Sequence, residues 1–281
     1  MTLSGTARVA GVMGWPVGHS LSPRLHGYWL EHYRIDGAYV PMAVKPERIA
    51  DALRALPVLG FAGANLTVPH KELALAVMDE VEPLARRVGA VNTVVVRSDG
   101  SLLGRSTDGF GFLANILDAV PNWNPGARPV TVIGAGGAAK AIAWALLDHG
   151  RGEVRIVNRT EARAQDLAGA LGARGRVFGW ARFGAALADT SLLVNATTLG
   201  MTGQPRLEFD LSALPKDAIV TDAVYAPLAT ELLKAARARG NRTVDGIGML
   251  LHQARPGFAA WFGTEPEVTD ELRTHVLAGR G

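Results

Sequence analysis

Glycines that end an apolar run offer the first recognisable chemistry in this sequence, which is the binding of phosphate groups. The β-branched run Val130–Ile133 leads through Gly134-Ala135-Gly136-Gly137-Ala138 into the helix-forming segment 141–147. Backbone N–H groups at the start of a helix bind a pyrophosphate, and glycine lets the backbone approach it closely. We expect Gly134 to make the tight turn and Gly136 to admit the phosphates. A plain turn between strand and helix is the alternative, because glycine loops also end ordinary strands.

Basic residues follow the next predicted strand, where a dinucleotide site recognises the ribose. The strand 154–157 ends at Asn158-Arg159-Thr160, and Arg163 follows closely. A site for NAD usually carries Asp or Glu here, bound to the ribose 2′-hydroxyl. A guanidinium stands here instead, and it can pair with a 2′-phosphate. The sequence therefore predicts NADP as the cofactor, and a solvated surface charge is the alternative interpretation of Arg159.

Polar side chains in the N-terminal half are candidates for substrate binding or proton transfer. Ser20 and Ser22 stand at a predicted helix start, where hydroxyls suit an anion, although Ser22 as an N-cap is the simpler interpretation. Lys71 lies in the first turn of a predicted helix, where its charge opposes the helix dipole unless it has another role. Asp108 opens another predicted helix, and capping is its simplest role. We interpret His70 as a loop histidine.

The elements that must position these residues alternate along the chain, which predicts the α/β class. A stretch rich in Pro, Asn and Gly, 121–126, separates the first half from the nucleotide-binding segment. Strands are predicted at 9–14, 37–44, 61–68, 90–97, 102–104, 130–133, 154–157, 176–178, 191–197 and 218–222. Helices are predicted at 22–34, 45–56, 82–88, 141–147, 160–170, 181–187, 231–239, 247–262 and 267–277, with further helices after Pro69 and from Asp108.

Composition excludes several classes of protein. The chain has 281 residues and 48% hydrophobic content, enough for one large or two medium domains. The net charge is only +3 and its charges are interspersed, so no nucleic-acid partner is expected. With 0 cysteines, disulfides and thiolate metal sites are excluded, and we predict no metal. The sequence shows neither a signal peptide nor a bilayer-spanning run, so we expect a cytoplasmic protein without a membrane partner.

Taken together, the motifs of this sequence resemble the shikimate dehydrogenase family over nearly the whole chain. The glycine loop with Asn158-Arg159-Thr160 is one of them. The other motifs, in chain order, are Gly14-x-Pro16-x-x-His19-Ser20-x-Ser22-Pro23-x-x-His26, Asn65-Leu66-Thr67-Val68-Pro69-His70-Lys71, Gly89-Ala90-Val91-Asn92-Thr93, Thr107-Asp108-Gly109, Asp222-x-x-Tyr225-x-Pro227 and Gly246-x-Gly248-Met249-Leu250-x-x-Gln253-Ala254.

This resemblance implies a fold of two α/β domains. Residues 1–107 and 246–281 would form the substrate-binding domain, because the C-terminal helices return to it. Residues 108–245 would form a Rossmann domain with a doubly wound parallel sheet that binds NADP. The implied activity is the reversible NADPH-dependent reduction of 3-dehydroshikimate to shikimate, in the pathway to aromatic amino acids.

The resemblance also implies roles for individual residues. Lys71 and Asp108 would carry proton transfer. Hydroxyl groups, without an arginine, would hold the substrate carboxylate, and other polar groups would contact the ring hydroxyls. The residues that would bind the substrate carboxylate are Ser20, Ser22 and Tyr225. The residues that would contact the ring hydroxyls are Thr67, Asn92, Asp108 and Gln253, with Lys71 beside them. The cofactor residues are Gly134, Ala135, Gly136, Gly137, Ala138, Asn158, Arg159, Thr160, Arg163, Thr197, Gly246 and Met249.

Two alternatives to this function stay open at the level of sequence. A quinate/shikimate dehydrogenase of broader specificity would share most of these motifs, although its NAD-using members are expected to carry an acidic residue near Arg159. A non-catalytic NADPH-binding regulator would be expected to have lost Lys71 or Asp108, and both are present. The expected partner is a small-molecule substrate, and a monomer or a homodimer is expected.

Overall fold

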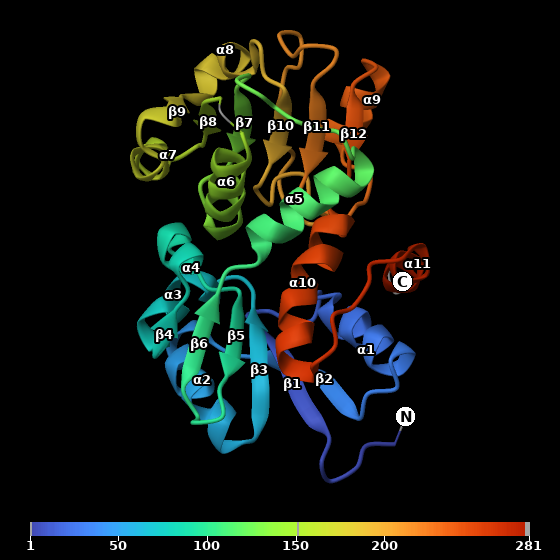
Figure 1. Cartoon of the computed structure of the whole chain (residues 1–281). Coiled ribbons are helices and arrows are strands. Elements are labelled where there is room, and N and C mark those ends of the chain that lie inside the picture. Colours follow the sequence, from blue (N-terminus) through green and yellow to red (C-terminus); the bar gives the residue numbers. More distant parts are fainter. Residues whose placement is uncertain (1, 151, 279–281) are drawn as a thin grey trace. The chain divides into compact units, whose positions relative to one another are not determined.

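The structure is a computed structural model, which describes residues 2–150 and 152–278. The chain divides into two compact units (Figure 1). The first unit comprises Met1–Asp108 and Leu250–Gly281, and the second comprises Gly109–Met249. Each unit contains one sheet of six strands. The N-terminal part of the chain and its last helices therefore belong to the same unit, although more than a hundred residues separate them in sequence.

The first unit is built on a mixed sheet. Its strands are β1 (Arg8–Gly14), β2 (Gly37–Ala43), β3 (Phe61–Leu66), β4 (Glu80–Val81), β5 (Thr93–Val96) and β6 (Leu102–Arg105). They lie in the order β2-β1-β3-β5-β6-β4. Strands β1, β2 and β3 are parallel, whereas β5 is antiparallel to both β3 and β6. Strands β1, β3 and β6 therefore end at the same edge of the sheet, where β5 begins.

Helices cover both faces of this first sheet. They are α1 (Ser22–His32), α2 (Ile49–Val58), α3 (His70–Leu73), α4 (Pro83–Val88), α10 (Ile247–Phe262) and α11 (Asp270–Leu277), with the 3₁₀ turns η1 (Pro46–Arg48) and η2 (Ala74–Val77). Successive residues of a strand face opposite sides of a sheet. Ala64 packs with Leu53 of α2, whereas its neighbour Gly63 lies against Trp261 of α10. Helices α2 and α10 therefore cover opposite faces.

The second unit is built on a parallel sheet. Its strands are β7 (Val130–Ile133), β8 (Val154–Val157), β9 (Gly175–Phe178), β10 (Leu192–Asn195), β11 (Ile219–Asp222) and β12 (Arg242–Val244). They lie in the order β12-β11-β10-β7-β8-β9, and every neighbouring pair is parallel. The chain proceeds outward from β7 to β9 and then crosses to β10 on the other side of β7. The strand order thus reverses between β7 and β10, and this reversal is the place where doubly wound folds bind dinucleotides.

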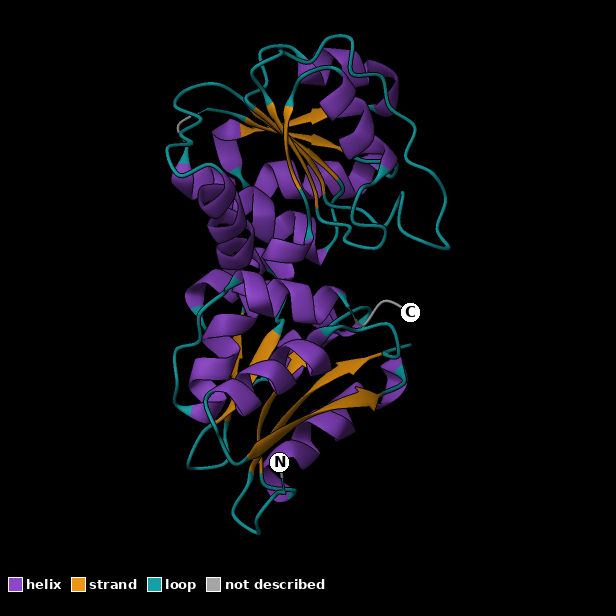
Figure 2. Cartoon of the chain, turned by 90° about the vertical axis from the view of Figure 1, so that its right-hand side faces the viewer, coloured by secondary structure: helices purple, strands orange, loops and turns teal. Residues whose placement is uncertain are grey.

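Helices also lie on both faces of this second sheet, as Figure 2 shows. They are α5 (Asp108–Ala119), α6 (Gly137–His149), α7 (Glu161–Ala170), α8 (Phe183–Leu187) and α9 (Glu231–Ala238), with the 3₁₀ turns η3 (Gly172–Arg174) and η4 (Trp180–Arg182). Buried Val132 packs with α5, α6 and α7, and its neighbour Ile133 packs with α8 and α9. Two apolar clusters therefore sandwich the sheet, and the predicted α/β fold with a doubly wound parallel sheet is confirmed.

Three local predictions from the sequence are wrong. Asp108 is not the N-cap of α5, because the helix begins at Asp108 and its carboxylate accepts from Lys71 and Asn92. Ser22 is not the N-cap of α1, because the helix begins at Ser22 and Leu21 occupies the cap position. His70 is not a loop histidine, because it is fully buried as the first residue of α3. Its Nε2 lies 2.9 Å from the carbonyl oxygen of Val44. Burial lowers the pKa of His70, so a neutral ring fits this position.

Candidate active site

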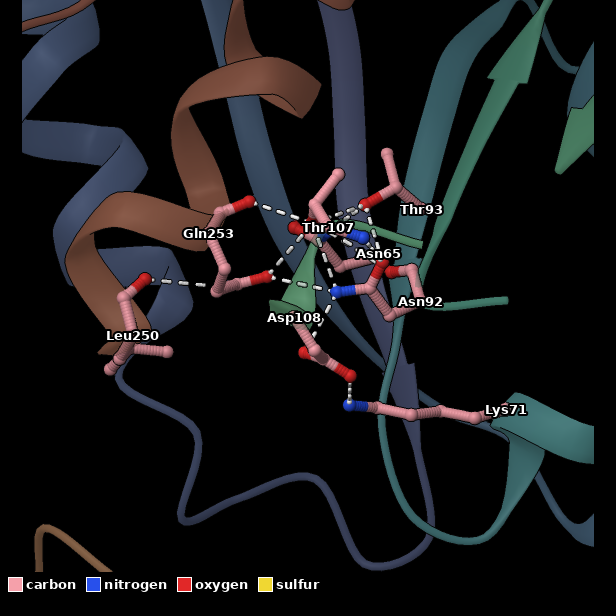
Figure 3. A network of polar contacts seen from close by, with 8 residues as sticks. All are labelled: Asn65, Lys71, Asn92, Thr93, Thr107, Asp108, Leu250 and Gln253. Atoms are coloured by element: carbon pink, nitrogen blue, oxygen red, sulfur yellow. Dashed lines mark hydrogen bonds and ion pairs between the residues drawn. The ribbon is translucent and has the colours of Figure 1, made fainter. Parts of the chain in front are cut away.

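An ion pair between Lys71 and Asp108 stands at the strand-end edge of the first sheet (Figure 3). Lys71 comes from α3, and Asp108 is the first residue of α5. The ammonium Nζ lies 2.6 Å from Asp108 Oδ2, with side-chain exposures of 19% and 8%. Few waters screen a pair at this depth, so its two charges interact more strongly than surface charges do. The two residues predicted for proton transfer are thus brought together from positions 37 residues apart.

The amide of Asn92 joins this pair to a third element. Asn92 immediately precedes β5, and its Nδ2 donates to Asp108 Oδ1 at 2.9 Å and to Gln253 Oε1 at 3.2 Å. Its Oδ1 accepts the backbone N–H of Thr107 at 2.8 Å. Asn92 is 2% exposed, so these bonds replace water almost completely. Four predicted site residues, Lys71, Asn92, Asp108 and Gln253, therefore form one hydrogen-bonded cluster (Figure 3).

Thr107 belongs to the same cluster, although the sequence analysis assigned it no role. It is 4% exposed, and its hydroxyl donates to the backbone oxygen of Gln253 at 2.8 Å. Gln253 Nε2 donates to Leu250 O at 3.1 Å, which turns the amide oxygen of Gln253 towards Asn92. This hydrogen bond from Thr107 connects the turn after β6 to α10. Its place in the Thr107-Asp108-Gly109 motif was the signal that could have identified it.

The other predicted residues of the first unit lie at the same edge of its sheet. Ser20 follows β1, and its Oγ accepts the backbone N–H of Ser22 at 3.3 Å. Thr67 follows β3, and its backbone N–H donates to Met13 O at 3.0 Å. A Cβ at Gly14 would lie 2.5 Å from the methyl group of Thr67, so glycine is needed for this approach. Ser20 and Thr67 therefore both follow strands that end at the edge of the sheet where the ion pair stands.

In the second unit, the glycine loop between β7 and α6 has the expected form. Gly136 is the N-cap of α6, which is 13 residues long. Gly134 has φ +118°, and a Cβ there would lie 3.0 Å from the methyl group of Thr197. A Cβ at Gly136 would meet no heavy atom within 4 Å. Packing within the protein therefore requires glycine at 134, whereas the space beside Gly136 is open for a phosphate group.

The different surroundings of Gly134 and Gly136 predict different effects of an alanine substitution at each position. Gly134→Ala is expected to destabilise the fold by about 1–3 kcal/mol, because a side chain is strained at that φ. Gly136→Ala is expected to leave thermal unfolding nearly unchanged, since the loss at an N-cap is at most about 1 kcal/mol. It should nevertheless raise the Kd for NADP⁺ at least about 10-fold, because the methyl group occupies phosphate space. Thermal unfolding and fluorescence titration measure both effects, and wild-type NADP⁺ affinity in Gly136→Ala would contradict this assignment.

Exposed arginines follow β8, as the sequence predicts. Arg159 and Arg163 are both exposed, at and just beyond the carboxyl end of this strand. Asn158 Nδ2 donates to Thr160 O at 2.8 Å, which holds the turn that carries Arg159. An exposed guanidinium is available for a bidentate contact with a phosphate group.

A buried carboxylate organises the neighbouring loops of the second unit. Asp222, at the end of β11, accepts from Thr230 Oγ1 at 2.7 Å, Asn195 Nδ2 at 2.9 Å and the Val224 N–H at 2.9 Å. Burial raises the pKa of Asp222 to about 6, although these three donors oppose the shift. Asn195 Oδ1 in turn accepts the Thr197 hydroxyl at 2.7 Å. The loops that carry Thr197 and Tyr225 are therefore anchored on one carboxylate.

The start of α10 approaches the same strand end. A Cβ at Gly246 would lie 2.6 Å from the backbone oxygen of Asp222, so the chain passes too close for a side chain. Met249 is the third residue of α10 and is partly buried. Gly246, like Thr197, therefore lies near the carboxyl end of a parallel strand in the second unit.

Neither a metal-binding cluster nor a membrane-spanning helix is found among the described residues. Within residues 2–150 and 152–278, no group of three or more His, Cys, Asp or Glu side chains is placed to hold a metal ion. In the same part of the chain, no helix has the length and apolar character needed to cross a membrane.

Comparison with known proteins places this chain in a family. Residues 12–94 match the shikimate dehydrogenase substrate binding domain, and residues 122–201 match the family described as shikimate / quinate 5-dehydrogenase. The shikimate dehydrogenase (NADP(+)) of Paramagnetospirillum magneticum is 58% identical over 276 residues, which cover 98% of this chain and 100% of the relative. The chain belongs to the shikimate dehydrogenase family. The predicted family is confirmed.

Solved structures agree with this assignment over nearly the whole chain. The shikimate 5-dehydrogenase of Thermus thermophilus, solved with NADP(H) and shikimate, has a TM-score of 0.84 and 36% identity, covering 97% of this chain and 98% of that one. The quinate dehydrogenase of Corynebacterium glutamicum, solved with NAD, has a TM-score of 0.87 and 35% identity, covering 97% and 99%. Overall similarity therefore does not separate a shikimate enzyme from a quinate enzyme. The distinction must come from particular residues of the site.

Proposed function

We propose that this protein catalyses the reversible NADPH-dependent reduction of 3-dehydroshikimate to shikimate, a step of aromatic amino-acid biosynthesis. The observation that carries the proposal is the Lys71–Asp108 pair, bonded to Asn92, in a chain that is 58% identical to a shikimate dehydrogenase (NADP(+)) along its length. Reduction of a ketone needs a hydride on carbon and a proton on oxygen. The cluster of the first unit can supply the proton and orient the substrate.

The residues of the second unit fit NADP. The open space beside Gly136, the N-terminus of the 13-residue α6 and the exposed Arg159 suit a pyrophosphate and a 2′-phosphate. When bound, NADPH supplies the hydride. Gly134–Ala138 would hold the pyrophosphate. The phosphorylated ribose would be held by Asn158, Arg159, Thr160 and Arg163. Thr197, Gly246 and Met249 would complete the cofactor site.

Lys71 is the proton donor in this proposal. In the direction of reduction, Lys71 Nζ would give its proton to the ketone oxygen of the substrate, and solvent would then reprotonate the amine. Its positive charge also stabilises the negative charge that develops on this oxygen. Asp108 Oδ2, at 2.6 Å, holds the ammonium in position. Asp108 would also accept a hydrogen bond from the neighbouring hydroxyl of the substrate.

Polar groups would orient the rest of the substrate. We assign its carboxylate to the hydroxyls of Ser20, Ser22 and Tyr225. Thr67, Asn92 and Gln253 would contact the ring hydroxyls together with Asp108. The Gln253 amide is already held by its bonds to Asn92 and to the Leu250 carbonyl, so it would bind with little loss of side-chain freedom.

The role of Tyr225 is tested by removing its hydroxyl alone. A hydrogen bond to a charged group contributes about 1.5–3 kcal/mol, so Tyr225→Phe is expected to raise the Kd for shikimate about 10- to 150-fold. The Kd for NADP⁺ and the melting temperature should stay close to those of the wild type. Calorimetric titration measures the two affinities. If the variant mainly loses thermal stability, Tyr225 is a packing residue and its assignment to the substrate is wrong.

One assay tests the overall function. The purified protein is offered shikimate or quinate with NADP⁺ or NAD⁺, and the reduced nicotinamide is followed by its absorbance. We expect the highest kcat/KM with shikimate and NADP⁺, because Arg159 stands where NAD sites usually carry an acidic residue. Preference for quinate with NAD⁺ would favour the quinate enzyme. No turnover with any pair would favour the non-catalytic regulator.

We also propose a cytoplasmic location and either a monomer or a homodimer. The absence of cysteine from the sequence is compatible with a reducing compartment, in which disulfides do not contribute to stability. Fractionation of cells tests the location, and sedimentation equilibrium measures the number of subunits.

A further inference from the structure

Buried polar side chains continue behind the Lys71–Asp108 pair into the core of the first unit. Tyr39 lies on β2, Asn65 on β3 and Thr93 on β5. Their exposed fractions are 7%, 5% and 0%. None of the three can reach solvent easily, so each must find its hydrogen-bond partners within the protein. The proton-transfer and substrate-binding roles assigned above use none of these three side chains.

Hydrogen bonds join these residues to Asp108 in one continuous chain. The Tyr39 hydroxyl donates to Asn65 Oδ1 at 2.7 Å, and Asn65 Nδ2 donates to Thr93 Oγ1 at 3.1 Å. The Thr93 hydroxyl donates to Asn92 Oδ1 at 3.1 Å, and Asn92 Nδ2 donates to Asp108 Oδ1 at 2.9 Å. Figure 3 shows all of these residues except Tyr39.

Every bond in this chain has the same direction. Tyr39 has its single hydroxyl proton committed to Asn65, and Thr93 accepts from Asn65, so the Thr93 proton is free to point at Asn92. Donors therefore follow one another from the core to the carboxylate. Bonds aligned in this way polarise and strengthen one another.

The chain decides which way the Asn92 amide faces. Its oxygen meets two donors, the Thr93 hydroxyl and the Thr107 N–H, while its NH₂ group meets the acceptors Asp108 Oδ1, Thr107 Oγ1 and Gln253 Oε1. A flipped amide would place oxygen against a carboxylate oxygen. Removal of the Thr93 hydroxyl takes away one of the two donors that oppose this flip.

We propose that Tyr39, Asn65 and Thr93 are positioning residues, which orient the amide of Asn92 and through it hold Asp108 in the geometry that Lys71 requires. This inference rests on the proposed function, in which Lys71 transfers the proton. Asp108 Oδ2 accepts from the charged Lys71 Nζ, and Asp108 Oδ1 accepts from the neutral amide of Asn92. The further partners of that amide, from β5, the turn after β6 and α10, are neutral as well. The position of Asp108 Oδ1 therefore depends on the orientation of the Asn92 amide.

The surroundings of Tyr39 support a fixed orientation of its hydroxyl. The His26 ring stacks on the Tyr39 ring with centroids 3.9 Å apart and planes 6° from parallel. Burial lowers the pKa of His26 to about 3, so this ring is neutral at physiological pH. Burial also raises the pKa of Tyr39 well above its ordinary value, which keeps the phenol protonated and able to donate. The first donor of the chain is thus permanently available.

Thr93→Val is the principal test, because valine keeps the shape of threonine and removes the hydroxyl. We expect kcat for shikimate oxidation to fall about 10-fold, the equivalent of one buried hydrogen bond, with an unchanged KM for NADP⁺. Thr93→Ser restores the hydroxyl and should return kcat to within about 3-fold of the wild type. A serine variant as slow as the valine variant would overturn the proposal, because the hydroxyl would then not be responsible.

A matched control separates positioning from stability. Thr131 is equally buried at 0% exposure in β7, and its hydroxyl donates to Ala186 O at 2.7 Å. Thr131→Val should lower the melting temperature about as much as Thr93→Val and leave kcat close to the wild-type value. If both variants lose kcat in proportion to stability, Thr93 is only structural. Where Thr93→Val does not fold, Tyr39→Phe removes the first donor alone, and its kcat should fall while KM for NADP⁺ stays unchanged.

A double-mutant cycle tests whether Thr93 acts through Asp108. In an Asp108→Asn background, Thr93→Val should reduce kcat by less than about 2-fold further, because the group it positions is already lost. An equal loss in both backgrounds would overturn the proposal. The wild type is measured in the same assay. If it does not turn over shikimate, the proposed function fails, whereas an active wild type with a fully active Thr93→Val variant refutes the positioning role alone.

Discussion

Lys71→Ala is expected to lower kcat for shikimate oxidation by about 10²–10⁴, the usual contribution of general acid–base catalysis. The substrate KM should change much less, because the hydroxyl and amide groups that bind the ring remain in place. Steady-state kinetics with NADP⁺ measures both constants. This expectation follows from the 2.6 Å contact between Lys71 Nζ and Asp108 Oδ2, which places one ammonium group at the proposed reaction centre.

The partner residue supplies the control for this first prediction. Asp108→Ala should lower kcat and also weaken substrate binding, because Asp108 is assigned a hydroxyl contact as well. The double variant should be little slower than Lys71→Ala, since residues that act as one unit lose activity non-additively. A Lys71→Ala enzyme with nearly normal kcat, folded by thermal unfolding, would contradict the mechanism. Strictly additive losses would mean that the two residues act independently.

Arg159→Ala is expected to raise KM for NADPH about 10- to 150-fold and to leave the use of NADH nearly unchanged. One charge-assisted hydrogen bond to the 2′-phosphate contributes about 1.5–3 kcal/mol, and NADH has no phosphate at this position. The side chain of Arg159 is exposed at the end of β8 and contributes little to stability, so the melting temperature of the variant should stay constant. Initial rates of ketone reduction with the two cofactors give the comparison.

The control for the cofactor prediction is an arginine of similar exposure elsewhere. Arg54 on α2 is exposed in the first unit, and Arg54→Ala removes the same net charge from the protein. It should leave KM for NADPH unchanged, which excludes a general effect of charge on a polyanionic cofactor. Equal losses with NADPH and NADH in Arg159→Ala would mean that this arginine acts on the cofactor site as a whole and does not select the phosphate.

Local patterns in the sequence were sufficient for the cofactor side of the molecule. A strand, a glycine turn and a helix are adjacent in sequence, so the proposed phosphate site at Gly134 and Gly136 lies within about twenty residues. The same holds for Arg159 at the end of the following strand. Alternation of apolar and polar segments likewise predicted the α/β class, because the periods of strands and helices are local properties of the chain.

Local reasoning was weaker where a residue's role depends on burial. Ser22 was interpreted as an N-cap from its type and position, yet the cap falls on Leu21. The sequence around His70 shows no metal or catalytic arrangement and favours a loop histidine, yet its ring is fully buried. Whether a polar side chain meets solvent or a backbone carbonyl is decided by the elements packed over it. That information is absent from the residue's own neighbourhood in sequence.

The sequence by itself determined the fold class, the glycine loop between β7 and α6 and, through its motifs, the family and the candidates Lys71 and Asp108. Only the tertiary structure decided how they act together. Lys71 and Asp108 meet because β3 and β6 end at the same edge of one sheet, and α10 brings Gln253 from 161 positions beyond Asn92 to the same amide. The direction of the donor chain from Tyr39 to Asp108 also arises in the fold. A hydrogen bond between distant residues depends on the path of the whole chain, and no short segment of the sequence specifies that path.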